Sequence, residues 1–314
     1  MAQVWAETTA ATERGMPMRR FGRTGERVSL MCLGGWHIGK PEDSEAIRIM
    51  HAAIDEGVTF FDNAWDYHDG HSEEVMGRAL ATGGKRKQVF LMSKDCERDY
   101  EGSLRSLEDS LRRLQTDYLD LWQFHECVYD NDPDWIFDRG AIRAAVEAQQ
   151  AGKVRYIGFT GHKDPRIHLK MLGKPHRFDA SLMPINVMDA HYRSFLNEVV
   201  PVCHSEGVAV LGMKGLGGGY PEGTLPAKAG LTVEECYRFA LSQPIASQVM
   251  GITSMEQLRS NVKLVRGFVP MPVAEQNTLL SKVREVAMDG RFETFKSTTQ
   301  HDGPHHRKQH GFAV

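Results

Sequence analysis

The chain has 314 residues, of which 41% are hydrophobic and 25% charged, and its formal net charge is −3. This composition is typical of a globular protein with a sizeable core, and without long runs of one charge it indicates no nucleic-acid or membrane-surface binding. The five cysteines lack C-x-x-C spacing, which indicates neither a disulfide framework nor an iron–sulfur or zinc site. No stretch reaches the about 18 apolar residues of a transmembrane helix. We therefore expect a cytoplasmic protein.

Apolar runs of strand length alternate with amphipathic helical patterns along the chain. The predicted strands are Val28–Cys32, Val58–Phe61, Val89–Met92, Tyr118–Phe124, Val154–Phe159, Ala180–Met183, Val208–Met213 and Gln248–Gly251. Helical patterns cover residues 43–56, 101–114, 135–150, 193–206, 232–242 and 255–265. Strands that alternate with helices predict a parallel sheet, and eight is the number that closes a barrel. We therefore predict an α/β protein with a single (β/α)8 TIM barrel rather than an open doubly wound sheet.

The two ends of the chain look peripheral to this barrel. Residues 1–16 read as a polar N-terminal extension, residues 17–290 as the barrel, and residues 291–314 as a His-rich C-terminal tail. The tail shows no periodic pattern and is expected either to be solvated or to fold over the barrel mouth. Its histidines could bind a metal, but we predict no metal site.

Four chemically active side chains stand where predicted strands end. Asp62 and Tyr67 follow the second run, Lys94 the third and His125 the fourth. In a TIM barrel the chemistry lies at the C-terminal ends of the strands, so these residues are expected on one rim. Taken singly, each has an ordinary structural explanation, such as a turn carboxylate, a surface charge or a packed ring. Together they indicate a proton-donor site.

At these residues the sequence resembles a known family. Met18-Arg19-Arg20-Phe21-Gly22, Leu33-Gly34-Gly35-Trp36 and the segment from Phe61-Asp62 to Tyr67 are similar to motifs of the aldo-keto reductases, over about residues 18–265. The resemblance implies hydride transfer between a nicotinamide dinucleotide and the carbonyl of an aldehyde, ketone or sugar.

The physical chemistry of the four side chains agrees with that resemblance. Tyr67 would protonate the nascent alkoxide, and Lys94 would lower the pKa of the phenol. Asp62 would keep Lys94 charged, and His125 would orient the carbonyl oxygen.

The resemblance also implies a cofactor site along the same rim. The implied cofactor residues are Gly35, Trp36, Thr160, Gly161, His162, Asn186, Met213, Lys214, Gly215, Leu216, Gly217, Gly251, Ile252, Thr253, Ser254, Gln257, Arg259 and Asn261. Thr253 or Ser254 can cap helix 255–265 and so direct its N-terminus toward a phosphate.

This segment departs from the family pattern. Gly251 and Gln257 stand where NADPH-preferring relatives carry Lys and Arg, although Arg259 or Lys263 could compensate. Met213 stands where relatives stack an aromatic ring on the nicotinamide. NADP is preferred as cofactor, and NAD stays an alternative.

Rings near the strand ends are candidates for the substrate pocket. They are Trp36, His37, Trp65, Tyr129 and Trp135. A small carbonyl or sugar substrate is expected, with no nucleic-acid or membrane partner. Two other functions stay open: a Schiff-base lyase that uses Lys94 as nucleophile, and a non-catalytic, cofactor-binding regulatory subunit. The sequence leaves the substrate, the direction of reaction and the oligomeric state open.

Overall fold

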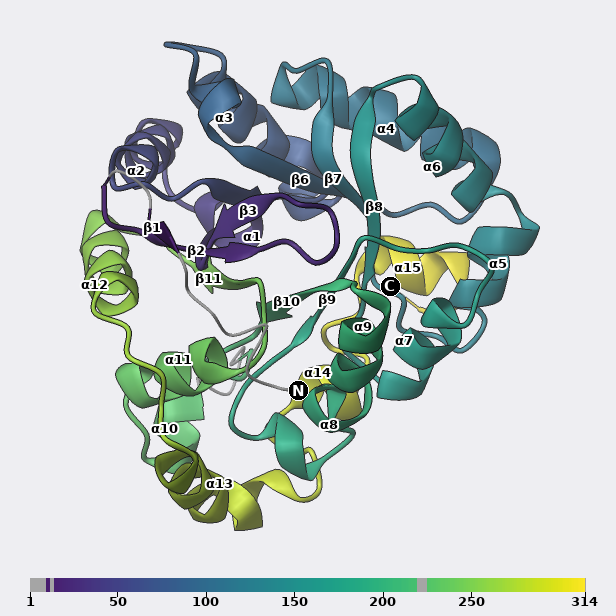
Figure 1. The fold of residues 1–314 in the computed structure, drawn as a ribbon. Helices are drawn as coiled ribbons and strands as arrows, with labels where there is room; N and C mark the ends of the chain where they lie inside the picture. Colours follow the sequence, from purple (N-terminus) through teal and green to yellow (C-terminus); the bar gives the residue numbers. More distant parts are fainter. Residues whose placement is uncertain (1–9, 12–13, 219–224, 314) are drawn as a thin grey trace.

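Eight parallel strands close into a barrel, in the order β10-β11-β4-β5-β6-β7-β8-β9, which confirms the predicted TIM barrel (Figure 1). This computed structural model describes residues 10–11, 14–218 and 225–313. The remainder of the N-terminal extension, residues 1–9 and 12–13, and Gly219 of the glycine-rich loop therefore lie outside the described residues.

The barrel strands follow the predicted apolar runs with small shifts at their ends. They are β4 (Met31–Gly34), β5 (Phe60–Asp62), β6 (Phe90–Asp95), β7 (Leu119–Phe124), β8 (Val154–Thr160), β9 (Ala180–Pro184), β10 (Ala209–Met213) and β11 (Ser247–Gly251). The interpretation of Val28–Cys32 as one strand is wrong. The chain turns at Leu30, whose N–H donates to Pro17 O, and this turn separates β3 (Arg27–Ser29) from β4.

The separated strand β3 belongs to a small antiparallel sheet with β1 (Ala10–Ala11) and β2 (Pro17–Arg20). This sheet leads to Phe21, whose ring packs against Phe60, Phe90 and Tyr156 of the barrel. Arg19 of β2 is buried and donates to the carbonyl oxygens of Leu241, Gln243 and Ile245. The N-terminal end of the barrel is therefore closed by apolar packing and by one buried guanidinium.

Helices surround the strands. They are α1 (Gly35–Ile38), α2 (Asp43–Asp55), α3 (His71–Leu80), α4 (Tyr100–Leu114), α5 (Asp132–Asp138), α6 (Ala141–Gln150), α7 (Pro165–Leu172), α8 (Phe195–Glu198), α9 (Val200–Glu206), α10 (Leu225–Ala229), α11 (Val233–Ser242), α12 (Met255–Arg266), α13 (Val273–Ala287), α14 (Thr294–Ser297) and α15 (Pro304–Gln309), with the 3-10 turns η1 (Tyr67–Gly70), η2 (Lys85–Gln88) and η3 (Asp189–His191). None of the helices in the described ranges is long and apolar enough to span a membrane.

Two predicted helices are each divided in the structure. Gly140, with φ 90°, separates α5 from α6 within the pattern at 135–150. The pattern at 193–206 breaks at Val199 into α8 and α9, and Pro201 stands in the first turn of α9, where its missing N–H costs no helical hydrogen bond. Helical periodicity persisted across both breaks, so the sequence pattern alone did not reveal them.

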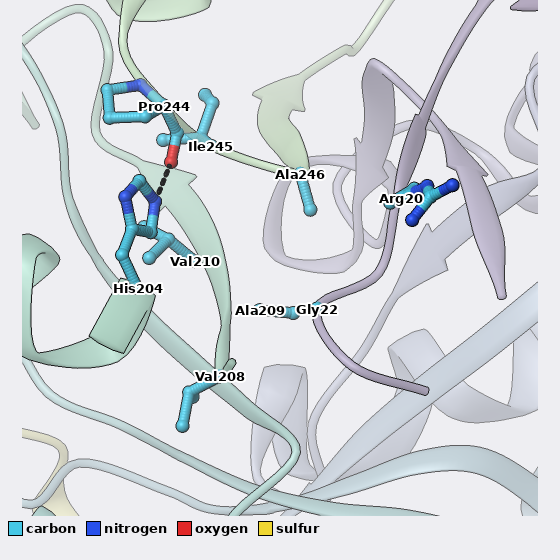
Figure 2. Close-up of a pocket in the computed structure, with 9 residues that line it drawn as sticks. All are labelled: Arg20, Gly22, His204, Val208, Ala209, Val210, Pro244, Ile245 and Ala246. Carbon is cyan, nitrogen blue, oxygen red and sulfur yellow. Dashed lines mark hydrogen bonds between the residues drawn. The ribbon is translucent and has the colours of Figure 1, made fainter. Parts of the chain in front are cut away.

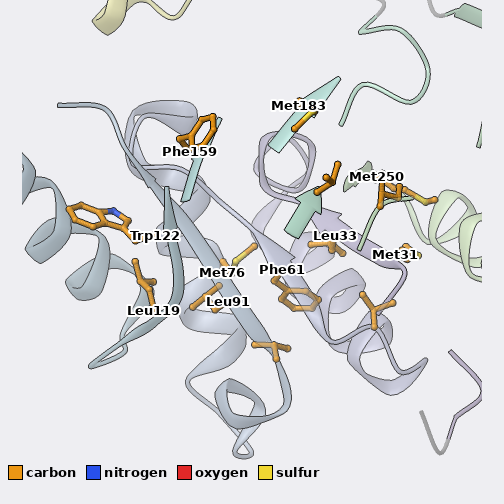
Figure 3. Close-up of a cluster of buried hydrophobic side chains, with 14 of the residues drawn as sticks. Met31, Leu33, Phe61, Met76, Leu91, Leu119, Trp122, Phe159, Met183 and Met250 are labelled. Carbon is orange, nitrogen blue, oxygen red and sulfur yellow. The ribbon is translucent and has the colours of Figure 1, made fainter. Parts of the chain in front are cut away.

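The core has two layers. Side chains that point outward from the strands pack against the helices, as Figure 3 shows for Leu33, Phe61, Leu91 and Trp122. Inward-pointing side chains such as Phe60, Met92 and Leu121 fill the barrel itself. The barrel is therefore a packed core, and chemistry has to take place at its rim.

A small cavity lies at the N-terminal end of the barrel, between Gly22, His204 and the starts of β10 and β11 (Figure 2). Its volume is about 10 Å³, which is enough for roughly one water molecule. This cavity is too small for an organic substrate.

A second buried cation fastens the C-terminal tail to the barrel. Lys296 of α14 is fully buried, and its Nζ donates to Asp189 Oδ1 at 2.7 Å, Tyr192 O at 2.8 Å and Glu293 Oε2 at 3.1 Å. Burial, opposed by Lys296 and reinforced by Asp189, raises the pKa of Glu293 to about 7. The tail is thus held by an ion cluster inside the protein. Although its sequence shows no periodic pattern, the tail forms the short helices α14 and α15.

Replacing Lys296 by methionine is expected to lower the free energy of unfolding by about 3 kcal/mol, because Asp189 and Glu293 would stay buried without their cation. Urea-induced unfolding followed by circular dichroism measures this change. Lys308→Met, which removes an exposed lysine of α15, is the matched control and should shift it by no more than about 0.5 kcal/mol. Equal effects of the two substitutions would contradict the anchoring role of Lys296.

Candidate active site

The ammonium of Lys94 lies at the centre of the C-terminal rim. Its Nζ donates to Asp62 Oδ1, to Asn63 O at 2.6 Å and to the hydroxyl of Tyr67 at 3.1 Å. Lys94 is 1% exposed and Asp62 3% exposed. All three N–H bonds of the ammonium therefore have acceptors, and one of them is the phenol.

The backbone after β5 brings these groups together. Gly35 at the start of α1 packs so closely on the backbone of Asp62 and Asn63 that a Cβ would not fit there. The N–H of Gly35 also contacts Asp62 Oδ2 at 3.4 Å. Further on, His68 and Asp69 adopt left-handed φ values of 53° and 55°, which is uncommon for residues with a side chain. This turn directs Tyr67 back toward Lys94.

His125 follows β7 and completes the group of four. Its ring lies 5.5 Å from that of Tyr67, edge to face. Its Nδ1 lies 3.1 Å from Asp66 Oδ1 and 3.5 Å from Cys96 Sγ. The structure thus brings Asp62, Tyr67, Lys94 and His125 together, although they come from three different strand ends.

Burial dominates the protonation equilibria of this cluster. The pKa of Tyr67 is raised well above its usual value, first by burial and then by the charges of Asp62, Asp66 and Glu126. The expectation that Lys94 gives a net decrease of this pKa is therefore wrong, because burial and the neighbouring acidic groups raise the pKa. Burial also lowers the pKa of His125.

The predicted cofactor residues lie along the rim at the ends of β4, β8, β9, β10 and β11 and on α12. Some of these residues contact Tyr67 or the C-terminal tail. Trp36 is 45% exposed and lies edge-on to Tyr67, with ring centroids 5.5 Å apart. His162 Nε2 is 3.6 Å from Asp302 Oδ1, and Asn186 Nδ2 donates to Glu293 Oε1 at 3.1 Å. These last two side chains contact the tail.

The remaining cofactor candidates form two groups. One surrounds the ends of β8 and β10: Thr160, Gly161, Met213, Lys214, Gly215, Leu216 and Gly217. The other lies between the end of β11 and α12, where Gly251 faces the ring of His37: Gly251, Ile252, Thr253, Ser254, Gln257, Arg259 and Asn261.

Two features of these groups fit a dinucleotide phosphate. Lys214, at φ 53°, begins the glycine-rich loop, and its Nζ lies over the ring of Phe295, 5.3 Å from the centroid. Ser254 is the N-cap of α12 and accepts a hydrogen bond from Gln257 N, so the positive end of this helix points to the rim. Gln257 turns its side chain back to Thr253, whereas Arg259 is exposed. A cation at the loop and a capped helix end are suitable partners for a diphosphate and a 2′-phosphate.

Three of the candidate substrate rings contact the tail rather than the group of four. Trp65 packs against His305, and Trp135 stacks on His310 with centroids 4.4 Å apart. Tyr129 donates to Asp302 Oδ2 at 2.9 Å. His37 lies beside Gly251, and burial together with the charge of Lys40 lowers its pKa to about 4.

Several residues at this rim were not identified from the sequence. They are Asp66, Cys96, Glu126, Asp302 and His306. Glu126 has φ 46°, accepts from Gly303 N at 2.7 Å, and has its pKa raised by burial and by Asp66 to about 8. No local motif marks these residues, because each belongs to a different loop or to the tail.

The chain is similar to known reductases over most of its length. The model of the Aldo/keto reductase family matches residues 30–225. The uncharacterized oxidoreductase YrpG of Bacillus subtilis is 30% identical over 298 residues, which cover 78% of this chain and 90% of that protein.

Solved structures agree in fold. The aldo-keto reductase AKR11C1 from Bacillus halodurans, in its holo form, superposes with a TM-score of 0.72 at 24% identity, covering 88% of this chain and 99% of that one. The thermostable aldo-keto reductase Tm1743, in complex with the inhibitor epalrestat, gives 0.67 at 25% identity, covering 85% and 100%. Because the family model spans more than half of the chain, this protein belongs to the aldo/keto reductase family of NAD(P)-dependent oxidoreductases.

Proposed function

We propose that this protein transfers a hydride between NAD(P)(H) and the carbonyl of an aldehyde, ketone or sugar, with Tyr67 as the proton donor. The observation that carries this proposal is the single ammonium of Lys94 that donates to both Asp62 and the Tyr67 hydroxyl. A phenol whose oxygen faces a buried cation can release its proton, because the cation stabilises the phenolate that remains.

Each of the other two residues supports this proton transfer. Asp62 balances the charge of Lys94 inside the barrel, where an unpaired cation would be costly. His125 lies edge-on to the Tyr67 ring, so a ring N–H can hold the substrate oxygen near the phenol and share the charge that develops on it.

A nicotinamide dinucleotide, when bound, supplies or accepts the hydride that no side chain can provide. In this proposal Lys214 and the glycine-rich loop hold the diphosphate, and the N-terminus of α12 with Arg259 holds the adenosine end. Thr160, His162 and Asn186 lie at the ends of β8 and β9 and are the proposed partners of the carboxamide. NADP is favoured over NAD because Arg259 offers an exposed cation on α12.

The geometry of Lys94 argues against a Schiff-base lyase. A nucleophilic amine needs a free lone pair, whereas Lys94 Nζ has three hydrogen-bond acceptors around it and is paired with Asp62. Treatment with borohydride and a carbonyl substrate should therefore leave Lys94 unmodified. Oxidation of NADPH or NADH with a panel of aldehydes, ketones and aldoses, followed by absorbance, separates an enzyme from a non-catalytic regulatory subunit.

Tyr67→Phe is expected to reduce kcat for carbonyl reduction by about 10²–10⁴-fold or more, because the alkoxide loses its proton donor. The ring still packs against Trp36 and His125, so the affinity for NADPH, measured by fluorescence titration, should stay near the wild-type value. Tyr118→Phe changes a hydroxyl remote from the rim and serves as the matched control. Turnover of Tyr67→Phe close to that of the control would refute the proposed mechanism.

Arg259→Ala is expected to raise KM for NADPH about tenfold and to leave KM for NADH unchanged, because one charge-assisted contact with the 2′-phosphate is lost. Arg266→Ala, at the other end of α12 where the guanidinium pairs with Glu56, is the control. If Arg259→Ala affected both cofactors equally, Arg259 would not recognise the phosphate and NAD would become the preferred cofactor.

A further inference from the structure

Four side chains with metal-ligand chemistry meet at the rim of the barrel. Asp66, Cys96 and His125 follow the successive strands β5, β6 and β7, and His306 comes from α15 of the tail. Each offers one ligand atom, and the four atoms all lie within 4.8 Å of one another. Cys96 and His306 are fully buried, and His125 is 5% exposed.

We propose that Asp66, Cys96, His125 and His306 form a binding site for one zinc ion. A thiolate, a carboxylate and two neutral imidazoles make a donor set that suits zinc better than the harder magnesium or calcium ions. The thiolate and the carboxylate together carry two negative charges, which balance the charge of Zn²⁺. Since all four ligands come from the protein, the site is closed and of the structural type.

The separations of His125 Nδ1 from two of the other ligand atoms are close to those in a zinc tetrahedron. With zinc about 2.3 Å from sulfur and about 2.0 Å from nitrogen or oxygen, neighbouring ligand atoms lie roughly 3.3–3.6 Å apart. His125 Nδ1 is 3.5 Å from Cys96 Sγ and 3.1 Å from Asp66 Oδ1. His306 lies on the same side, with its ring centroid 5.5 Å from that of His125.

One of the ligand groups has a buried nitrogen without a hydrogen-bond partner. Asp66 Oδ1 lies 3.1 Å from His125 Nδ1. His306 Nε2 lies 3.8 Å from Glu126 Oε2 and has no hydrogen-bond partner among the described residues. Buried polar atoms of this kind are rare because each costs about 1–3 kcal/mol, so they require an explanation such as an ion. A zinc ion would supply a partner for His306 Nε2 and would replace the direct contact between His125 and Asp66.

The guanidinium of Arg98, which lies beside His306, is compatible with the proposed zinc site. Arg98 Nη2 approaches His306 Nδ1 to 3.4 Å, but its two hydrogens already have closer acceptors in His125 O at 2.7 Å and Glu126 O at 3.1 Å. Its charge is paired with Asp132 at 2.9 Å. Arg98 therefore does not need His306 as an acceptor, and His306 Nε2 stays available to a metal.

Zinc at this position would have two consequences. It would fasten α15 to three barrel loops and so fix the tail over the rim. It would also take the lone pair of His125 Nδ1, which leaves the proton on Nε2 and makes that nitrogen a hydrogen-bond donor. The second consequence rests on the proposed function, whereas zinc binding itself does not.

The test is zinc content and affinity of the full-length protein. After incubation with zinc and removal of loosely bound ions on a chelating resin, mass spectrometry of the metal should give one zinc per chain. Cys96→Ser and His306→Gln should bind zinc at least about 100-fold more weakly, because even the loss of an outer contact typically costs 10–100-fold. His305→Gln and Cys127→Ser are the matched controls, since His305 faces Glu97 and the Cys127 thiol contacts Phe124 O.

Cobalt provides an independent measurement on the wild-type protein, whose spectrum does not depend on the folding of any variant. The wild-type protein loaded with Co²⁺ should show the visible absorption of tetrahedral cobalt and a thiolate-to-cobalt charge-transfer band, which Cys96→Ser should lose. The proposal would be overturned if the wild-type protein bound no zinc or if its cobalt form lacked the thiolate band. It would also be overturned if His305→Gln weakened zinc binding as much as His306→Gln. Tyr67→Phe should keep its zinc, so loss of turnover and loss of metal are separable outcomes.

Discussion

The burial of the Lys94 ammonium is the constraint on which the candidate site depends. Removing a cation from water is expensive, and the cost is offset only if acceptors surround it. Here the acceptors are Asp62, the carbonyl of Asn63 and the hydroxyl of Tyr67. All three belong to the end of β5 and the loop that follows it. The need for hydrogen-bond acceptors around one buried ammonium thus fixes the path of the loop and brings the Tyr67 phenol to the rim.

The tail depends on a similar arrangement. Lys296 is held by Asp189 and Glu293, and Glu293 in turn accepts from Asn186 at the end of β9. Asn186 Oδ1 also accepts the N–H groups of Met188 and Asp189. The Asn186 amide has two N–H donors, of which Glu293 takes one, so this side chain links β9 to the tail and keeps one N–H for another acceptor.

The sequence predicts those features that depend on local periodicity. Apolar runs end at Asp62, Lys94 and His125, and because parallel strands of a barrel share one rim, the run ends alone place these residues near one another. The split between β3 and β4 was missed because Val28–Cys32 is apolar except for Ser29. It depends on a hydrogen bond from Leu30 to Pro17, a contact with an earlier strand that no periodicity reveals.

Long-range contacts and burial set the limit of such prediction. The net pKa of Tyr67 depends on Asp66, Glu126 and the degree of burial, and the sequence gives none of these distances. Likewise His306 lies 181 positions beyond His125 in the sequence, yet the tail places the two rings in contact. A metal motif is recognisable in a sequence when its ligands share a helix or a turn, as in H-E-x-x-H. Asp66, Cys96, His125 and His306 come from three loops and the tail and have no such spacing, so only the folded chain could show that these side chains meet.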